Sequence, residues 1–177
     1  MKKFLGVITI LAVIFAAGAA FSASKAPELE GGGKISVFIL VDRGITANMN
    51  DRQERAQNDI GDWMGDDLVR MFNKAGYEAT LIEKKNEYTP GPGKYLLKAT
   101  IVNYNSGSKA ARMFVGYGAG AASMDMRYEL SGKGESLLNY DDGVGSGRDW
   151  RNVARKLNDT ALKRVTEKMN EMHKKAD

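Results

Sequence analysis

A glycine-rich segment in the middle of the chain separates two stretches that have the alternating pattern of β-strands. The stretch before it, residues 95–104, places Leu97 and Ile101 on one side and Tyr104 on the other. The stretch after it, residues 123–130, alternates in the same way. We therefore expect two strands joined by a long connection, and this pair organises the rest of the sheet.

The N-terminus has the three regions of a secretory signal peptide. Residues 1–24 begin with Lys2 and Lys3, continue with an apolar run and end in small residues. Cleavage after Ser22 or Ser24 fits this pattern best, and the alternative is an uncleaved N-terminal membrane helix. The sequence therefore predicts export to the periplasm or secretion.

Removal of this segment leaves roughly 150 residues, which is enough for one domain with a sizeable core. It also removes two lysines, so the formal charge of +4 becomes +2, which gives little support for nucleic-acid binding. The chain has no cysteine. We therefore expect no disulfide, no lipid anchor and no thiol nucleophile.

The rest of the chain divides into three parts. Residues 25–33 contain a run of three glycines and are expected to form a flexible linker. Residues 34–172 are expected to form a single domain, and residues 173–177 a frayed tail. Residues 35–41 are apolar nearly throughout, which is typical of a central strand covered on both faces.

Two amphipathic helices are expected, at residues 50–75 and 149–172. The first contains Gly61 and Gly65, which destabilise a helix by about 1 kcal/mol each relative to alanine. Their two explanations are close packing of the helix on the sheet and contact with a partner helix. The first helix carries an excess of acids and the second an excess of bases, which favours neighbouring positions.

These elements predict an α/β (α+β) fold with a single domain. We expect a mixed sheet of four or five strands, two helices on one face of it, and the order β-α-β-β-β-β-α. Strand, helix and strand in succession indicate a right-handed parallel unit. The later strands are joined by short turns and are expected to be antiparallel.

The corner between the last strand and the last helix is a candidate anion site. Glycines precede a helix N-terminus there, and backbone N–H groups at such a place favour anions. The pattern is neither a Walker motif nor a dinucleotide fingerprint. Three arginines share the first turns of the helix, where they either pair with acids, such as Asp141, Asp142 or those of the first helix, or meet an anion. The residues of this candidate anion corner are Gly145, Gly147, Arg148 and Arg151, with Arg155 on the same helical face.

Catalytic and metal signals are weak. The only histidine, His173, lies in the expected tail. Adjacent acids occur only at Asp66–Asp67 and Asp141–Asp142, and such pairs are usually solvated. Met124 and Met126 have the spacing of thioether ligands, but on a strand they share one face and are expected in the core. We propose no catalytic residue, no metal and no cofactor.

The central segment and its flanking strands together have a pattern found in a known family. They resemble the bacterial envelope family catalogued as domain of unknown function 4410. The resemblance covers residues 34–172, and its distinctive residues are Arg112, Val115, Gly116, Gly118, Ala119 and Gly120. It implies an envelope compartment and this fold, and no established activity. Many members look like lipoproteins, whereas this chain lacks the cysteine of a lipid anchor.

The leading hypothesis is an exported, non-enzymatic envelope protein that acts as a binding or assembly module through its Gly-Ala-rich segment. The partner is expected to be an envelope protein or a second copy of the chain, with no nucleic acid. Peripheral contact with a membrane surface is a further interpretation. The alternatives are a segment buried as a longer hairpin, and an enzyme or anion-binding protein that uses residues 143–155. The candidate interaction surface consists of Arg112, Phe114, Val115, Gly116, Tyr117, Gly118 and Gly120.

Overall fold

The computed structural model describes residues 25–27, 33–107, 121–146 and 149–174. The order of the elements along the chain confirms the prediction. They are β1 (Ser36–Asp42), α1 (Asp51–Lys74), β2 (Glu78–Ile82), the short 3-10 helix η1 (Lys85–Glu87), β3 (Lys94–Asn105), β4 (Ala122–Gly132), β5 (Glu135–Ser146) and α3 (Trp150–Lys174).

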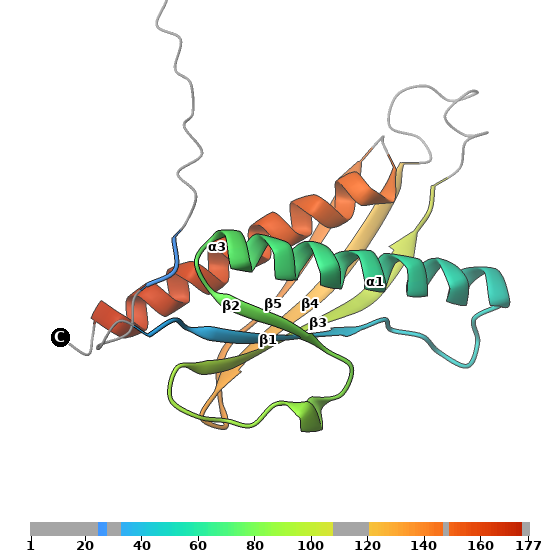
Figure 1. Ribbon diagram of the computed structural model, residues 1–177. Helices are drawn as coiled ribbons and strands as arrows, with labels where there is room; N and C mark the ends of the chain where they lie inside the picture. The colour runs from blue at the N-terminus through green and yellow to red at the C-terminus, as the bar shows by residue number, and fades with distance from the viewer. Residues whose placement is uncertain (1–24, 28–32, 108–120, 147–148, 175–177) are drawn as a thin grey trace, which may run out of the picture.

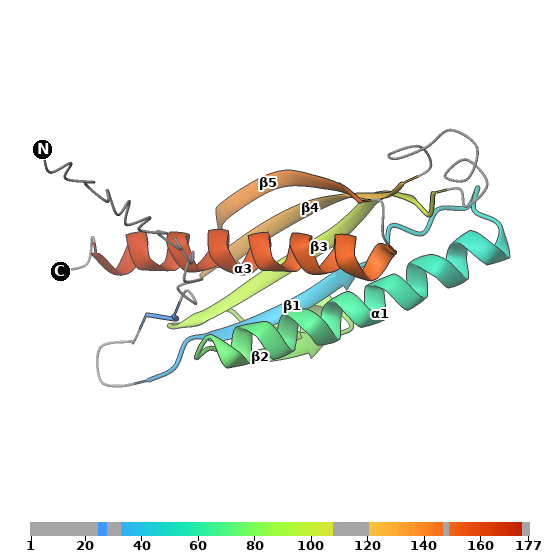
Figure 2. The ribbon, with the colours of Figure 1, turned by 90° about the horizontal axis from the view of Figure 1, so that it is seen from above.

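The sheet has five strands in the order β2-β1-β3-β4-β5. β1 pairs in parallel with both β2 and β3, and β3, β4 and β5 pair antiparallel in succession. The sheet is therefore mixed, as predicted. β1 lies inside it, while β2 and β5 form its two edges (Figure 2).

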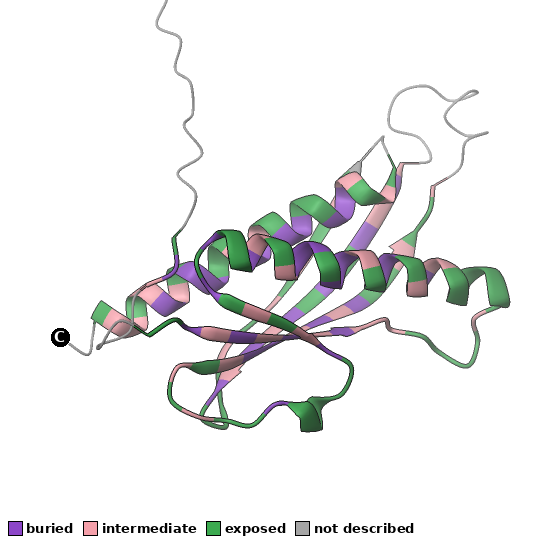
Figure 3. Ribbon diagram, in the orientation of Figure 1, coloured by how far each residue is buried: buried purple, intermediate pink, exposed green. Residues whose placement is uncertain are grey.

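Both helices cover the same face of the sheet, as predicted (Figures 1 and 2). α1 packs on β1 and β2, α3 packs on β4 and β5, and the helices contact each other. Alternate strand positions such as Ile39 and Leu130 meet helix positions such as Met64 and Leu157, all of them fully buried. The core is the layer between helices and sheet, and the exposed positions lie outside it (Figure 3).

α1 begins at a capping box in which the Asn50 side chain accepts from the backbone of Gln53 and the Gln53 side chain accepts from the backbone of Asn50. Its two internal glycines lie against the sheet side of the molecule. A Cβ at Gly65 would lie 2.8 Å from the side chain of Leu81 on β2, and one at Gly61 would lie 2.7 Å from the side chain of Arg43. Close packing on the sheet is therefore confirmed for Gly65, whereas Gly61 makes room for a side chain of the loop that follows β1.

A β-bulge in β3 changes which face of the sheet the side chains of its last residues occupy. The register passes from Ile101 opposite Met126 to Tyr104 opposite Met124, with Val102 as the extra residue. Tyr104 consequently packs against the core, whereas Val102 is 54% exposed. The prediction that Tyr104 faces away from Ile101 is wrong, because strict alternation does not anticipate an inserted residue.

The second face of β1 is covered by the connection between β2 and β3, which passes across the side of the sheet opposite the helices (Figure 1). Ile82, Tyr88 and Leu96 form a small buried cluster there, with Phe38 and Leu40 of β1 packed against it. β1 is thus covered on both faces, as its apolar sequence predicts.

The ends of the described chain pack more extensively than expected. Ala26 is buried and its N–H donates to the carbonyl of Ala75 at 2.8 Å, so contact with the domain begins before residue 34. α3 continues to Lys174, two residues past the expected end. Among the residues described, no helix is long and apolar enough to cross a membrane.

Candidate functional site

The candidate interaction surface lies outside the described residues, because residues 108–120 are not placed. The structure does place the two strands that carry it. β3 and β4 pair from Tyr95 opposite Gly132 to Asn105 opposite Ser123. We call this paired unit the β3–β4 stem. Its free end lies at the same end of the sheet as Ser146 of β5, which pairs with Ala122.

Polar side chains cover the face of the stem opposite the helices. The Arg127 guanidinium donates to both carboxylate oxygens of Asp141, at 2.8 and 3.1 Å. This hydrogen-bonded pair lowers the pKa of Asp141 and raises that of Arg127. Asn103 donates to the carboxylate of Asp125 at 3.2 Å. Of the alternatives left open for the arginines of the last helix, pairing with Asp141 does not occur among the described residues, because Arg127, directly opposite on β4, binds this carboxylate.

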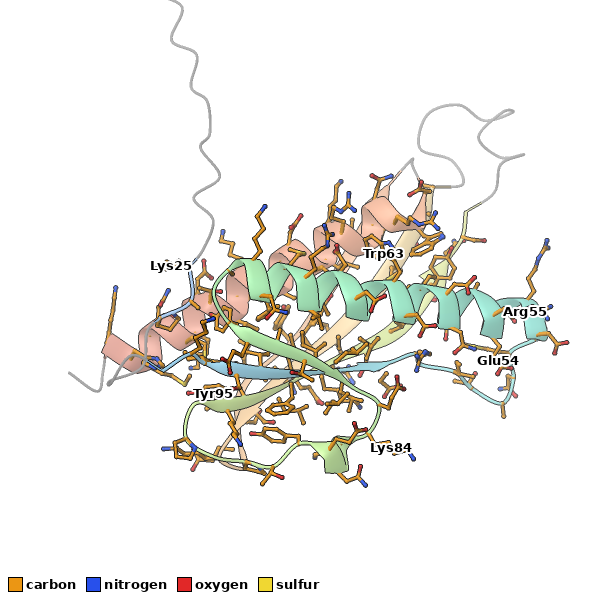
Figure 4. The ribbon with its side chains drawn as sticks, in the orientation of Figure 1. Lys25, Glu54, Arg55, Trp63, Lys84 and Tyr95 are labelled. Atoms are coloured by element: carbon orange, nitrogen blue, oxygen red, sulfur yellow. The ribbon has the colours of Figure 1, made fainter. Side chains whose placement is uncertain are left out.

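The arginines at the start of α3 stack on aromatic rings. The guanidinium of Arg151 lies 4.7 Å from the ring centroid of Trp150, and that of Arg155 lies 5.5 Å from the ring of Trp63. The two tryptophans meet edge to face, with their centroids 5.8 Å apart. Trp63 lies between α1 and α3 (Figure 4). We call these four residues the tryptophan–arginine cluster.

The sequence pattern did not predict this cluster. It left carboxylates or an anion as the partners of the arginines, and it gave no link between these arginines and Trp63. The sequence nevertheless contained a signal for this contact. Trp63 lies on the first helix and Trp150 at the start of the last one, so the two side chains can meet if the helices are neighbours. Cation–π contacts of this kind stabilise by about 0.5–1 kcal/mol at exposed sites.

The candidate anion corner is described only in part, since Gly147 and Arg148 lie outside the described residues. Gly145 is exposed, and a Cβ there would meet no atom within 4 Å. The carboxylate of Asp149 accepts from the backbone N–H of Asn152 at 3.2 Å. An acidic side chain thus already caps the N-terminus of α3.

The adjacent acids have structural roles where the structure describes them. Asp67 is 3% exposed, forms an ion pair with Arg70, and accepts from the side chain of Asn158 at 3.0 Å. Asn158 also donates to the carbonyl of Met64 at 3.3 Å, which links the two helices. Asp66 is exposed. Within the described residues no three histidine, aspartate or glutamate side chains come together as metal ligands.

Two tyrosines stack beneath α3 and carry buried hydroxyls. Tyr128 of β4 and Tyr140 of β5 have ring centroids 5.2 Å apart, and Arg164 lies 4.3 Å above the ring of Tyr140. Neither hydroxyl has a hydrogen-bond partner. Burial raises the pKa of both phenols, that of Tyr128 well above its ordinary value. Met124 and Met126 are buried in the same layer, which confirms their expected place in the core.

A groove of about 600 Å³ runs between β5 and α3, and we call it the β5–α3 groove. It contains Leu138 of β5, and its other residues come from one side of α3. A smaller hollow of about 340 Å³ lies at the other end of the stem, near Gly132 and His173. The residues of α3 that line the β5–α3 groove are Thr160, Lys163, Arg164, Glu167, Lys168 and Glu171.

Comparisons with known proteins identify a family. The model of the family described as Domain of unknown function (DUF4410) matches residues 23–148. No curated protein matches the chain significantly.

Among solved structures, the chain is similar to the PelC dodecamer from Paraburkholderia phytofirmans, with 14% identity, a TM-score of 0.49, and coverage of 78% of this chain and 92% of that one. It is also similar to a protein of family DUF330 from Xanthomonas campestris, with 9% identity, a TM-score of 0.46, and coverage of 85% and 95%. A third similar structure is the lipoprotein GNA1162 from Neisseria meningitidis, with 12% identity, a TM-score of 0.38, and coverage of 75% and 98%. Similarities this distant do not transfer a function.

Proposed function

The chain belongs to the family described as Domain of unknown function (DUF4410), which matches residues 23–148, and from this premise we propose a function in binding. The protein is an exported, non-enzymatic envelope protein that acts as a binding or assembly module. Its contact surface is the Gly-Ala-rich segment, and its partner is an envelope protein or another copy of the chain.

The observation that carries this proposal is the β3–β4 stem. β3 and β4, which have 12 and 11 residues, pair over nearly their full length. The segment follows the end of β3 and precedes the start of β4 in the sequence. The helix-facing side of the stem is anchored by fully buried residues such as Leu97 and Met126. A rigid two-stranded support is what a binding loop needs, since loops that carry function are typically held by a fixed scaffold.

The composition of the segment supports a contact surface. Met113, Phe114, Val115 and Tyr117 are too apolar for a segment that only links two strands in water. Long connections without their own structure are commonly functional. Arg112 adds a charge that can orient a partner.

No observation favours the alternative enzyme or anion-binding function. At the anion corner, Arg151 and Arg155 are engaged by tryptophan rings and Asp141 by Arg127. A site for chemistry needs converging acid, base or nucleophilic groups. Where the described residues place such groups in this corner, they are already paired with one another or with aromatic rings.

The test replaces the two aromatic residues of the segment and measures binding and folding together. A Phe114→Ser/Tyr117→Ser double variant should lose its partners in affinity capture from intact envelopes while its melting temperature is unchanged. The matched control is Ile45→Ser/Val102→Ser, which removes two apolar side chains that are 42% and 54% exposed elsewhere on the surface. This control should keep every partner.

Two results would contradict the proposal. If the double variant keeps all partners, the segment is not the contact surface. If it loses several kcal/mol of folding stability, the usual result of emptying buried aromatic sites, the segment belongs to the core.

Export is tested separately. Mass spectrometry of the protein from its native host should find a mature N-terminus between Ala23 and Lys25, because signal peptidase cleaves after small residues. An intact Met1 on the bulk of the protein would contradict export with processing.

A further inference from the structure

The two edge strands of the sheet differ in how far their outward-facing backbone groups are hydrogen-bonded, and we call an edge closed where such groups are bonded. β2 has five residues, and the side chain of Asn73 on α1 bonds its outer backbone. Asn73 accepts from the N–H of Ala79 at 2.9 Å and donates to the carbonyl of the same residue at 3.3 Å. In a parallel pair, alternate residues direct their N–H and C=O groups away from the neighbouring strand. A five-residue strand in which the outer N–H and C=O of Ala79 are already bonded offers little to another chain.

β5 forms the other edge and is open. It has 12 residues, and among the described strands it pairs with β4 alone. About half of its backbone donors and acceptors therefore point outward. Native proteins usually protect such an edge with lysine, proline, a bulge or a covering element. β5 contains neither lysine nor proline, and its one bulge, at the extra residue Leu137, lies next to the turn and leaves residues 138–146 in regular pairing with β4.

The β5–α3 groove determines what can lie beside this edge. A strand added to β5 would direct alternate side chains toward α3, into the groove. Leu138 and the aliphatic parts of Lys163 and Lys168 offer apolar contact there, and Arg164 is held over Tyr140. On the opposite face the strand would pass beside Asp141, which is exposed and already binds Arg127. The edge thus suits an extended segment with apolar side chains on the side that faces the groove.

The chain itself carries a segment of this description. In an extended conformation, residues 112–120 place Met113, Val115, Tyr117 and Ala119 on one side. The other side carries Arg112, Phe114 and three glycines, so most of it is bare. An extended chain rises about 3.3 Å per residue, so these nine residues span about 30 Å and fit within the 12-residue edge.

A segment of the same chain does not reach far enough to pair along its own β5. The thirteen residues 108–120 span at most about 43 Å when extended. They leave β3 and return to β4, and strands are about 4.8 Å apart, so passing outward across β5 and back takes about 25 Å. About 18 Å would remain, and because the chain must run along β5 and return to the same end, only about three residues could pair. A second copy has no such restriction, because its stem can approach from outside.

We propose that residues 112–120 of one copy add as a strand to the β5 edge of a second copy, with Met113, Val115 and Tyr117 in the β5–α3 groove. This inference rests on the proposed function, since it names the partner of the same segment. The segment and the edge lie at different places on the surface, so the contact is heterologous. Repetition of such a contact produces a ring or a filament.

Because the chain contains no cysteine, the contact is testable by site-specific disulfide cross-linking. One preparation of the processed chain carries Tyr117→Cys and a second carries Lys163→Cys, an exposed residue that lines the groove. The matched control replaces Lys163→Cys with Thr80→Cys, an exposed residue on the opposite edge strand. After mixing and mild oxidation, the Tyr117/Lys163 pair should give at least several-fold more mixed disulfide dimer than the Tyr117/Thr80 pair.

Sedimentation of the cysteine-free chain supplies the second measurement, and it should show concentration-dependent association. Equal cross-linking at the two edges, or a chain that stays monomeric at every concentration, overturns this inference. The proposed function has separate criteria, because it fails if Phe114→Ser/Tyr117→Ser keeps its envelope partners or loses several kcal/mol of folding stability. A monomer that still loses partners through that variant would retain the proposed function and exclude self-docking on β5.

Discussion

The two edge strands of this sheet show two ways of ending a sheet. β2 is short, and α1 closes it through the side chain of Asn73. β5 is more than twice as long, and its contacts are with α3 over one face and with β4 along its inner edge. Packing stability and protection of the outer backbone are therefore separate properties. An edge strand can be firmly packed by its side chains while its backbone remains available to another chain.

The difference follows from what covers each strand. Gly65 lets α1 approach Leu81 of β2 closely, which brings Asn73 within reach of the outer backbone. α3 instead lies over the inner face of β5, where Tyr140 packs between Tyr128 and the guanidinium of Arg164. The side of α3 that continues past β5 forms one wall of the β5–α3 groove. The helix therefore holds β5 without covering its edge.

The largest expected effect concerns the packing that anchors β5. Tyr128→Ala should destabilise folding by about 3–5 kcal/mol, because it empties a fully buried aromatic site. Tyr128→Phe is the matched control and should be neutral or slightly stabilising, since the hydroxyl it removes has no partner. Urea unfolding of the three proteins measures both. If Tyr128→Phe loses as much as Tyr128→Ala, the hydroxyl contributes to stability and the anchor is not a packing effect.

A smaller effect is expected at the closed edge. Asn73→Ala removes both hydrogen bonds to Ala79, each with a net contribution of about 0.5–1.5 kcal/mol, so the free energy of unfolding should fall by about 1–3 kcal/mol. Lys74→Ala, one residue along the same helix, is the control and should change it by less than about 0.5 kcal/mol. Equal values for the two variants would show that Asn73 does not close β2.

Much of the fold that produces these two edges could be predicted from the sequence. The apolar run of β1, the helical periods of α1 and α3, and the alternation along β4 all have strong local signals, and they predicted the element order and the shared face of the helices. The buried stripe of α3 agrees at Val153, Leu157 and Val165. Long periodic elements are predictable because burial of one face dominates their energetics.

Other features depend on contacts between residues distant in sequence. The bulge at Val102 has no local signal, since a valine fits a regular strand equally well. The bond from Asn73 to Ala79 depends on how closely α1 approaches β2, and the stacking of Arg155 on Trp63 depends on how the helices cross. The sequence predicted a candidate surface at residues 112–120, which lie outside the described structure, so that part of the site stays a prediction.

The next prediction uses pH to probe the tyrosines beneath β5. Burial raises the pKa of Tyr128 above its ordinary value of 10.0, and the pKa of Tyr140 is raised in the same direction. Because folding favours the neutral phenols, their contribution is fully present below pH 10.0 and is lost as the pH rises from there toward the folded-state pKa. Unfolding free energies should therefore fall as the pH rises above 10.0. Tyr128→Phe should show a shallower decline, and an identical decline would contradict the assignment to Tyr128.

The smallest expected effect on stability is also the most direct test of the open edge. Asn139 is exposed on β5 and lies opposite Glu129 of β4, so Asn139→Lys places an opposite charge beside Glu129 and should change the free energy of unfolding by less than about 0.5 kcal/mol. A lysine on an edge strand disfavours the addition of another strand, and here it would also repel Arg112 of the incoming segment. Sedimentation should therefore show weaker self-association of Asn139→Lys at unchanged melting temperature.

Thr80→Lys puts the same charge on the closed edge and should leave self-association unchanged. If both variants associate like the original chain, β5 is not the docking edge. If Thr80→Lys alone weakens association, the roles of the two edges are reversed.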